Sequence, residues 1–169
     1  MYDLCLSDIT LTTWALLRQT WAVMDKAAET RLAKVGLTPE KVGVLWICRD
    51  YPGLLTTAEI ARFLTRQSQS VTGLLNRMEE EGLVARTPKR KGRPFTEIKL
   101  TEKGEKAAQA GIAVIKVLVS ETAPVLSPED RKQLHKYLEI LRQQIVDELH
   151  LELTPPPDIP ERDLIPVKW

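Results

Sequence analysis

Residues 56–100 read TTAEIARFLTRQSQSVTGLLNRMEEEGLVARTPKRKGRPFTEIKL and contain two helix signals, a turn and a basic hairpin. Thr56 and Glu59 have the spacing of a capping box, in which a hydroxyl and a carboxylate each accept a backbone N–H at a helix start. A short helix is therefore expected from Thr56, followed by a turn near residues 65–67. A second helix is expected after the turn, because apolar residues recur there at helical spacing. These residues are Val71, Leu74, Leu75 and Met78.

The side of the second helix opposite these apolar residues is polar. A rotation of about 100° per residue places on this side Gln69, Thr72, Gly73, Asn76 and Arg77. Amide, hydroxyl and guanidinium groups hydrogen-bond base edges or phosphates, and a glycine permits close approach. For the helix taken alone, a solvated surface explains the same pattern equally well.

A basic hairpin follows the second helix. Gly82 is well placed to end that helix in the left-handed conformation, and strands are expected at 83–86 and 96–100. Between the strands, the sequence PKRKGRPF contains four cations, Lys89, Arg90, Lys91 and Arg93. A basic loop alone is more often just solvated. Its position next to an amide-rich helix instead favours a wing that contacts the DNA backbone or minor groove.

The order of these elements, the segment SVTGLLNRMEEEGLV, the basic hairpin and the closing LTEKG resemble the winged helix-turn-helix of the MarR (multiple antibiotic resistance regulator) family. The resemblance covers the chain apart from its proline-rich tail. It implies a mainly α fold with a small β-hairpin wing, in which a winged helix-turn-helix core is flanked by long dimerisation helices. The expected parts are an N-terminal dimerisation helix at 1–36, the DNA-binding domain at 37–100, C-terminal dimerisation helices at 101–151 and an extended tail at 152–169.

The N-terminal part predicts a long helix from Ile9 to Val35, ended by Gly36. Its apolar stripe consists of Trp14, Leu17, Trp21, Met24, Ala28 and Leu32. Trp14 and Trp21 could line a ligand pocket or pack in a subunit interface, and packing is the favoured interpretation. Thr38 and Pro39 then supply a capping hydroxyl and a first-turn proline for the next helix, which carries Trp46.

The C-terminal part predicts two more helices. Thr101 caps the first, and residues 107–119 are apolar on nearly every side, so this helix is expected to be buried among others. Ser127 and Pro128 start the last helix, which has a narrow apolar seam formed by Leu134, Leu138, Leu141, Ile145 and Leu149. The seam could pack on the chain's own first helix. The family resemblance implies instead that it joins a homodimer interface.

Composition restricts the remaining possibilities. The net charge is only +1, from 24 Lys and Arg against 23 Asp and Glu, so a nucleic-acid contact must be local. Cys5 and Cys48 lack CxxC spacing and the histidines are not clustered, so no zinc finger, metal site or cofactor is expected. Cys48 is predicted to be inert in the core. Redox sensing by Cys5 is a weaker alternative, suggested by some relatives, because no neighbour in LCLSD lowers a thiol pKa.

No signal peptide or uninterrupted apolar run of membrane-spanning length is evident, so a cytoplasmic protein without membrane contact is expected. No nucleophile–base pair or metal-ligand set indicates an enzyme. A winged-helix module that binds protein is a further alternative, which four cations beside an amide-rich helix disfavour. The tail TPPPDIPERDLIPVKW has five prolines and is expected to be disordered or to lie as an arm over the partner subunit.

Two copies of the reading helix predict a pseudo-palindromic operator in double-stranded DNA, with the helices ~34 Å apart. Base-edge contacts are assigned to Gln69, Asn76 and Arg77. Phosphate contacts are assigned to Gln67, Ser68, Ser70 and Thr72. Arg93 is assigned to the minor groove, while Lys89, Arg90 and Lys91 either contact the backbone or compete for the minor-groove position. Many family members carry an Asp two residues before the wing arginine, where this chain has Lys91, so the wing tip is expected to be less preorganised.

The resemblance also implies a mode of regulation. Family members are often repressors released by a small aromatic or anionic compound that binds between the DNA-binding lobe and the dimerisation helices. Trp14, Trp21 and Trp46 are the candidates for a wall of this effector site, and a purely structural role explains all three equally well.

Overall fold

The computed structural model describes residues 8–51, 55–87 and 96–151. The described chain is mainly helical with one two-stranded hairpin, which confirms the predicted fold class. The helices and strands, in order, are α1 (Ile9–Leu32), α2 (Pro39–Asp50), α3 (Thr57–Phe63), α4 (Ser68–Glu80), β1 (Val84–Thr87), β2 (Glu97–Leu100), α5 (Glu102–Thr122) and α6 (Pro128–Glu148). Two 3-10 turns, Ala33–Val35 and Ala123–Val125, extend α1 and α5.

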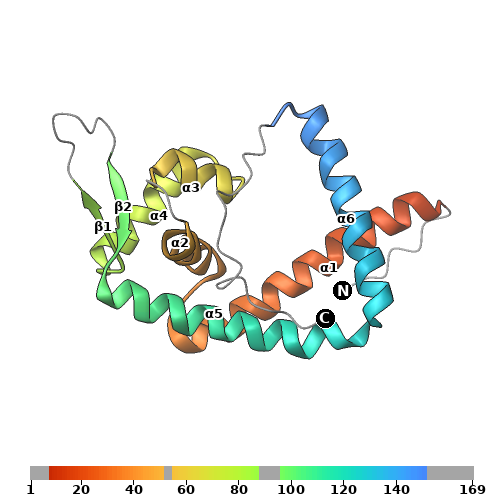
Figure 1. The fold of residues 1–169 in the computed structure, drawn as a ribbon, viewed down its shortest axis with the longest axis horizontal. Coiled ribbons are helices and arrows are strands. Elements are labelled where there is room, and N and C mark those ends of the chain that lie inside the picture. The colour runs from red at the N-terminus through yellow and green to blue at the C-terminus, as the bar shows by residue number, and fades with distance from the viewer. Residues whose placement is uncertain (1–7, 52–54, 88–95, 152–169) are drawn as a thin grey trace.

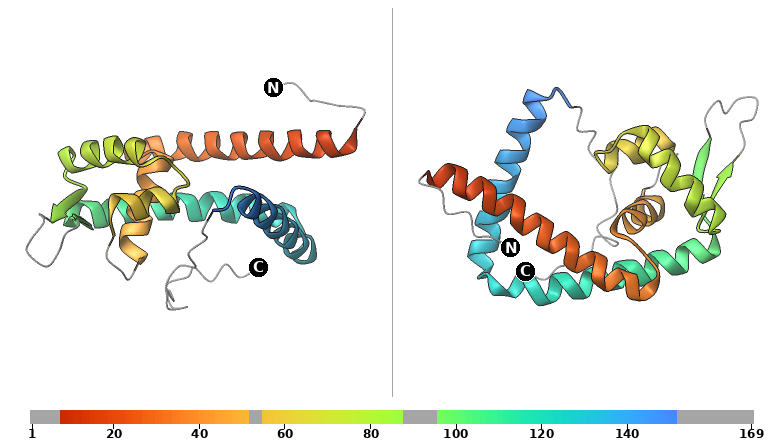
Figure 2. Two further views of the ribbon diagram at one scale, coloured as in Figure 1. Left: turned by 90° about the horizontal axis from the view of Figure 1, so that it is seen from above. Right: turned by 180° about the vertical axis from the view of Figure 1, so that it is seen from behind.

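The elements separate into a compact end and an extended end. Figure 1 shows α2, α3, α4 and the hairpin gathered at one end, with α5 running away from them towards α6. The right-hand view of Figure 2 shows α1 leaving the same end and diverging from α5, so that the first half of α1 lies away from the helix-turn-helix. The contact between α1 and α5 lies where both helices adjoin the compact end.

The predicted helix starts are confirmed by their hydrogen bonds. At α3, the Thr56 N–H donates to Glu59 Oε2 at 2.9 Å and the Glu59 N–H donates to Thr56 Oγ1 at 3.3 Å, which is the capping box. The hydroxyls of Thr38, Thr101 and Ser127 accept from the first turns of α2, α5 and α6 in the same way. These local signals fix where each helix begins.

The end of α4 is a glycine-capped reversal. Gly82 has φ +70°, and its N–H donates to the Glu79 carbonyl at 2.9 Å while the Leu83 N–H donates to the Met78 carbonyl at 2.8 Å. This pair of bonds is the Schellman motif, which favours glycine at the left-handed position. The chain therefore turns back beside α4 and enters β1 within two residues.

The hairpin that follows is antiparallel, with Val84 opposite Leu100 and Thr87 opposite Glu97. The predicted strands are confirmed, although β1 begins and ends one residue later than expected because Leu83 belongs to the helix-ending motif. On the other side of the hairpin, the Ile98 N–H donates to the Leu55 carbonyl at 2.9 Å. The hairpin is thus attached to the segment that leads into α3.

The core lies between α2, α3, α4, the hairpin and the first half of α5. The inner face predicted for α4 is confirmed, since Val71, Leu74, Leu75 and Met78 are all buried. Large side chains without exposed surface meet them from the neighbouring elements; these include Leu32, Leu45 and Ile60. This core holds the helix-turn-helix and the hairpin as one unit.

In α5 and α6, which form much of the extended end, apolar side chains are more exposed than the sequence predicted. Burial of residues 107–119 on nearly every side is wrong for the single chain: Ile112 and Leu118 are buried, but Val117 is 51% exposed. The α6 seam is 39–58% exposed, so it is not buried on the chain's own first helix. The physical reason is that these helices extend beyond the core, where no other described element reaches their apolar sides.

By length and composition alone, one helix of the described chain could cross a membrane. It is the segment Glu102–Val125, with a mean hydropathy of 1.2, and core helices of soluble proteins pass the same test. In this structure α5 contacts both α2 and α1.

Candidate nucleic-acid interface and the adjoining pocket

The outward side of α4 carries the side chains that were predicted to contact DNA bases. Gln69, Thr72 and Asn76 are exposed on it, and Gly73 lies between them with little side-chain bulk around it. The Thr72 hydroxyl donates to the Ser68 carbonyl at 2.8 Å, which occupies its hydrogen in the helix itself. The two amides therefore remain the groups best able to address base edges.

Most of the residues that were predicted to contact phosphates lie together at the beginning of α4. Gln67 is the N-cap residue, yet its side chain makes no capping hydrogen bond, and Ser68 and Ser70 are exposed in the first turn. Unsatisfied N–H groups and the positive end of the helix dipole lie at this terminus. The arrangement suits an anionic phosphate oxygen.

The flanks of α4 face two other parts of the molecule. Rotation of about 100° per residue puts Ser70, Arg77 and Glu81 on one flank, and this flank lines a pocket. Glu79 lies on the opposite flank and contacts the hairpin. Arg77, predicted to contact a base edge, therefore stands between the outward side and the pocket.

The pocket, of about 770 Å³, is formed by residues of α1, of the start of α2, of the end of α3 with the turn after it, and of α4. Its apolar wall comes from α1, the end of α3 and α4, and includes Trp21, Phe63, Leu64, Val71 and Leu74. Its polar wall comes from the start of α2 and from the neighbouring helices, and includes Asp25, Thr38, Lys41, Arg66, Arg77 and Glu81. Aromatic and aliphatic walls with a few polar groups are typical of small-molecule sites.

Of the three tryptophans predicted to line an effector site, the structure brings one to this pocket. Trp21 is in its wall, whereas Trp14 and Trp46 are not among the lining residues. Phe63 and Asp25 are lining residues that the sequence analysis missed. No periodicity within one helix identifies them, because the pocket depends on where α1 is placed relative to α3 and α4.

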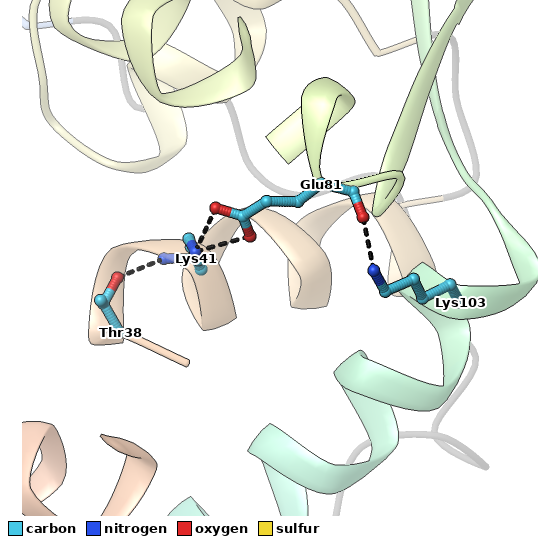
Figure 3. A network of polar contacts seen from close by, with 4 residues as sticks. All are labelled: Thr38, Lys41, Glu81 and Lys103. Atoms are coloured by element: carbon cyan, nitrogen blue, oxygen red, sulfur yellow. Dashed lines mark hydrogen bonds and ion pairs between the residues drawn. The ribbon is translucent and has the colours of Figure 1, made fainter. Parts of the chain in front are cut away.

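A polar network lines the pocket at the end of α4. The Lys41 ammonium lies 2.7 Å from both carboxylate oxygens of Glu81, and Lys103 donates to the Glu81 carbonyl at 2.7 Å; Figure 3 shows these contacts together. The Lys41 side chain is only 15% exposed. The network therefore ties the start of α2 and the start of α5 to the last turn of α4, and it neutralises Lys41.

The other charged groups of the pocket are less constrained. Arg66 and Glu40 are separated by 3.8 Å and both are well exposed, a geometry that contributes little. Arg77 reaches back along α4, where its Nη1 would lie 3.8 Å from a Cβ added at Gly73. The start of α2 also places the positive end of a helix dipole at the pocket wall, which favours an anionic group.

Several predicted residues lie outside the described residues. They are the wing cations Lys89, Arg90, Lys91 and Arg93, residues 1–7 with Cys5, and the tail at 152–169. Cys48 is described: it packs against the core, and burial raises the pKa of its thiol to about 12. A thiol with that pKa is protonated at neutral pH, which supports the prediction that Cys48 is unreactive. Within the described ranges, no group of three or more His, Cys, Asp or Glu could hold a metal ion.

Comparison with known proteins gives consistent relatives. Residues 35–93 match the model of the MarR family. The chain is 29% identical over 131 residues to the HTH-type transcriptional repressor MdtR of Bacillus subtilis (strain 168), covering 78% of this chain and 81% of the relative.

Solved structures share the fold. The S. aureus MepR–DNA complex superposes with a TM-score of 0.72 at 24% identity, covering 77% of this chain and 96% of that chain. The organohalide-sensing regulator RdhR-CbdbA1625 in its 2,4-dichlorophenol-bound form gives a TM-score of 0.78 at 23% identity, covering 88% and 89%. The matched residues 35–93, the curated relative and the shared fold make this chain similar to the winged helix-turn-helix regulators of the MarR family.

Proposed function

We propose that this chain is a homodimeric repressor that binds a pseudo-palindromic operator in double-stranded DNA and is released by a small aromatic or anionic compound. The outward side of α4 is the observation that carries the proposal. Gln69 and Asn76 are seven residues apart, so they lie on one side of the helix about 10 Å from each other. Side-chain amides at this spacing suit adenine edges in the major groove, with Gly73 between them permitting close approach.

The exposed apolar surfaces support the homodimer. The α6 seam, Leu134, Leu138, Leu141, Ile145 and Leu149, is exposed along its whole length in the single chain. In α1, Trp14 is 61% exposed and Trp21 is 68% exposed. A soluble monomer rarely exposes contiguous apolar surface on this scale. A second copy that packs against α1 and α6 would cover these surfaces and place two α4 helices on one operator.

The pocket supports the effector. It joins α1, which belongs to the proposed dimerisation part, to α2, α3 and α4 of the reading part. A compound in this position can favour one arrangement of the two parts over another, which is the thermodynamic requirement for release. An aromatic ring would lie against Trp21 and Phe63, and an anionic group would address Arg77 or the start of α2. Relatives include a regulator bound to 2,4-dichlorophenol and one bound to salicylic acid, which are suitable first probes.

DNA binding is tested with the purified protein and a fragment from its own upstream region, by fluorescence anisotropy at several salt concentrations. We expect sequence-preferring binding with a steep fall of log affinity against log salt. Replacing Gln69 or Asn76 by Ala should each cost ~1–3 kcal/mol of specific binding. Gln109→Ala, which removes an exposed amide from α5, is the matched control. Wild-type affinity in both α4 variants would refute the assignment of this face.

The effector is tested by titrating tryptophan fluorescence with 2,4-dichlorophenol and with salicylate. Binding in the pocket should quench Trp21 and release the operator over the same concentration range. The Trp21→Phe variant should lose most of the quenching, while Trp14→Phe, which changes a residue outside the pocket, should retain it. Equal quenching in both variants would place the compound elsewhere.

A further inference from the structure

The hairpin is held at both edges by groups that belong to the helix-turn-helix. Arg86 in β1 and Ile98 in β2 face each other in the register. Both send their N–H groups outward: the Arg86 N–H donates to Glu79 Oε1 at 3.1 Å, and the Ile98 N–H donates to the Leu55 carbonyl at 2.9 Å. Outward N–H groups on both members are typical of a non-hydrogen-bonded pair in an antiparallel ladder.

Glu79 makes a second contact with the same strand residue. Its Oε2 lies 2.7 Å from Arg86 Nη1, so one carboxylate accepts from both the backbone and the guanidinium of Arg86. The Glu79 and Arg86 side chains are 38% and 26% exposed, which shields the contact partly from water. A two-stranded hairpin is marginally stable alone, so its edge contacts decide how firmly it is held.

We infer that Glu79 is a positioning residue for DNA binding, fixing the hairpin at the angle to α4 that lets both contact one operator. The inference rests on the proposed function. Glu79 leaves α4 on the flank away from the pocket, and the outward side with Gln69 and Asn76 lies between the two flanks. Its role is therefore to hold β1 in place, and its own carboxylate does not contact DNA.

The direction in which the Glu79→Gln substitution changes DNA affinity distinguishes a positioning role from a purely electrostatic effect. Removing a carboxylate beside a polyanion reduces repulsion, and Glu79→Gln would also free the Arg86 guanidinium to attract phosphate. Electrostatics alone thus predicts tighter DNA binding by Glu79→Gln. A positioning role predicts weaker binding, because the hairpin loses its fixed angle. Glu80→Gln is the matched control, since Glu80 is the next residue, carries the same charge and is exposed on the outward side.

The experiment measures operator affinity, its salt dependence and amide exchange on the full chain. We expect Glu79→Gln to bind roughly three- to tenfold more weakly, in the range of a partly exposed charge-assisted contact, and Glu79→Ala more weakly still. The slope of log affinity against log salt should become shallower in Glu79→Ala, because fewer phosphates are contacted together. Glu80→Gln should bind as tightly as wild type or more tightly. A stability change alone would not move the salt slope.

Amide exchange measured on the DNA-free protein tests the contact between Glu79 and Arg86. In Glu79→Ala the Arg86 amide should exchange at least ~10-fold faster, while the Ile98 amide, bound to Leu55, should keep its protection. Unchanged exchange at Arg86 would overturn the inference, as would faster exchange with operator affinity and salt slope equal to wild type. A wild-type protein that binds no DNA refutes the proposed function itself, whereas wild-type binding with equal affinity in Glu79→Gln and Glu80→Gln refutes only the role of Glu79.

Discussion

Gly73→Ala should make the protein more stable but lower its affinity for the operator DNA. Gly73 lies in the interior of α4, and a Cβ added there would meet only Arg77 Nη1, at an ordinary contact distance of 3.8 Å. Alanine therefore fits without strain. Replacing an unstrained helix-interior glycine gains ~1 kcal/mol, because alanine loses less backbone entropy on folding. In a chain of this size that gain corresponds to a rise in melting temperature of about 2–4 °C.

The same methyl group stands between Gln69 and Asn76 on the outward side of α4. It should hold the helix backbone away from the groove and loosen the amide contacts, so that operator affinity falls roughly tenfold, or about 1.4 kcal/mol. Calorimetry and anisotropy on one preparation measure both effects. Gly111→Ala is the control for stability: its Cβ would lie 2.7 Å from Val42 Cγ2, so it should destabilise the protein. A Gly73→Ala variant that is more stable and binds DNA as well as wild type would refute the close-approach argument.

Three further outcomes follow from the structure. Gly104→Ala should destabilise the protein by at least ~2 kcal/mol in thermal melts, because its Cβ would lie 1.9 Å from the Leu83 carbonyl oxygen, which already accepts from the Thr101 N–H. Leu141→Glu should shift sedimentation of the free protein towards the monomer, because it places a charge in the exposed seam proposed for the dimer. Cys48 should resist alkylation by iodoacetamide at pH 8, as mass spectrometry would show. Because burial raises its pKa from 9.0 to about 12, its contribution to stability should be present below pH 9 and decline as the pH rises above 9.

Local chemistry made the compact end of the molecule predictable. The capping box at Thr56, the left-handed Gly82 and the apolar face of α4 each depend on residues within one turn or two of each other. Such features can be predicted from residues that are close in the sequence. The predicted positions of the helix starts and of the reversal into β1 therefore agree with the structure to within one residue. The same reasoning places the polar side of α4 outward, since a helix has one buried side and the rest follows from rotation.

The extended end and the pocket could not be predicted in the same way. An apolar helix side indicates that the side is buried, but it does not identify the element that packs against it. For α5 and α6, no described part of the chain packs against much of the apolar side. Trp14 and Trp21 are one heptad apart on α1, yet of the two only Trp21 lines the pocket, together with residues of α2, α3 and α4. Which part of α1 comes near those helices is a tertiary property. Glu79 likewise has no assigned role in the sequence analysis, because its contact with Arg86 depends on the reversal at Gly82.

The position of the pocket on a flank of α4 constrains how any effector must act. Ser70, Arg77 and Glu81 line it from the helix whose outward side carries Gln69 and Asn76, so a ligand that displaces this flank displaces the reading groups with it. The Lys41–Glu81 contact opposes such a displacement by holding the last turn of α4 to α2. In the proposed function, release therefore requires a compound that binds more tightly when α4 has moved than when it has not, by the free energy that DNA binding loses. A compound with equal affinity for both positions would leave the operator occupied, however tightly it bound.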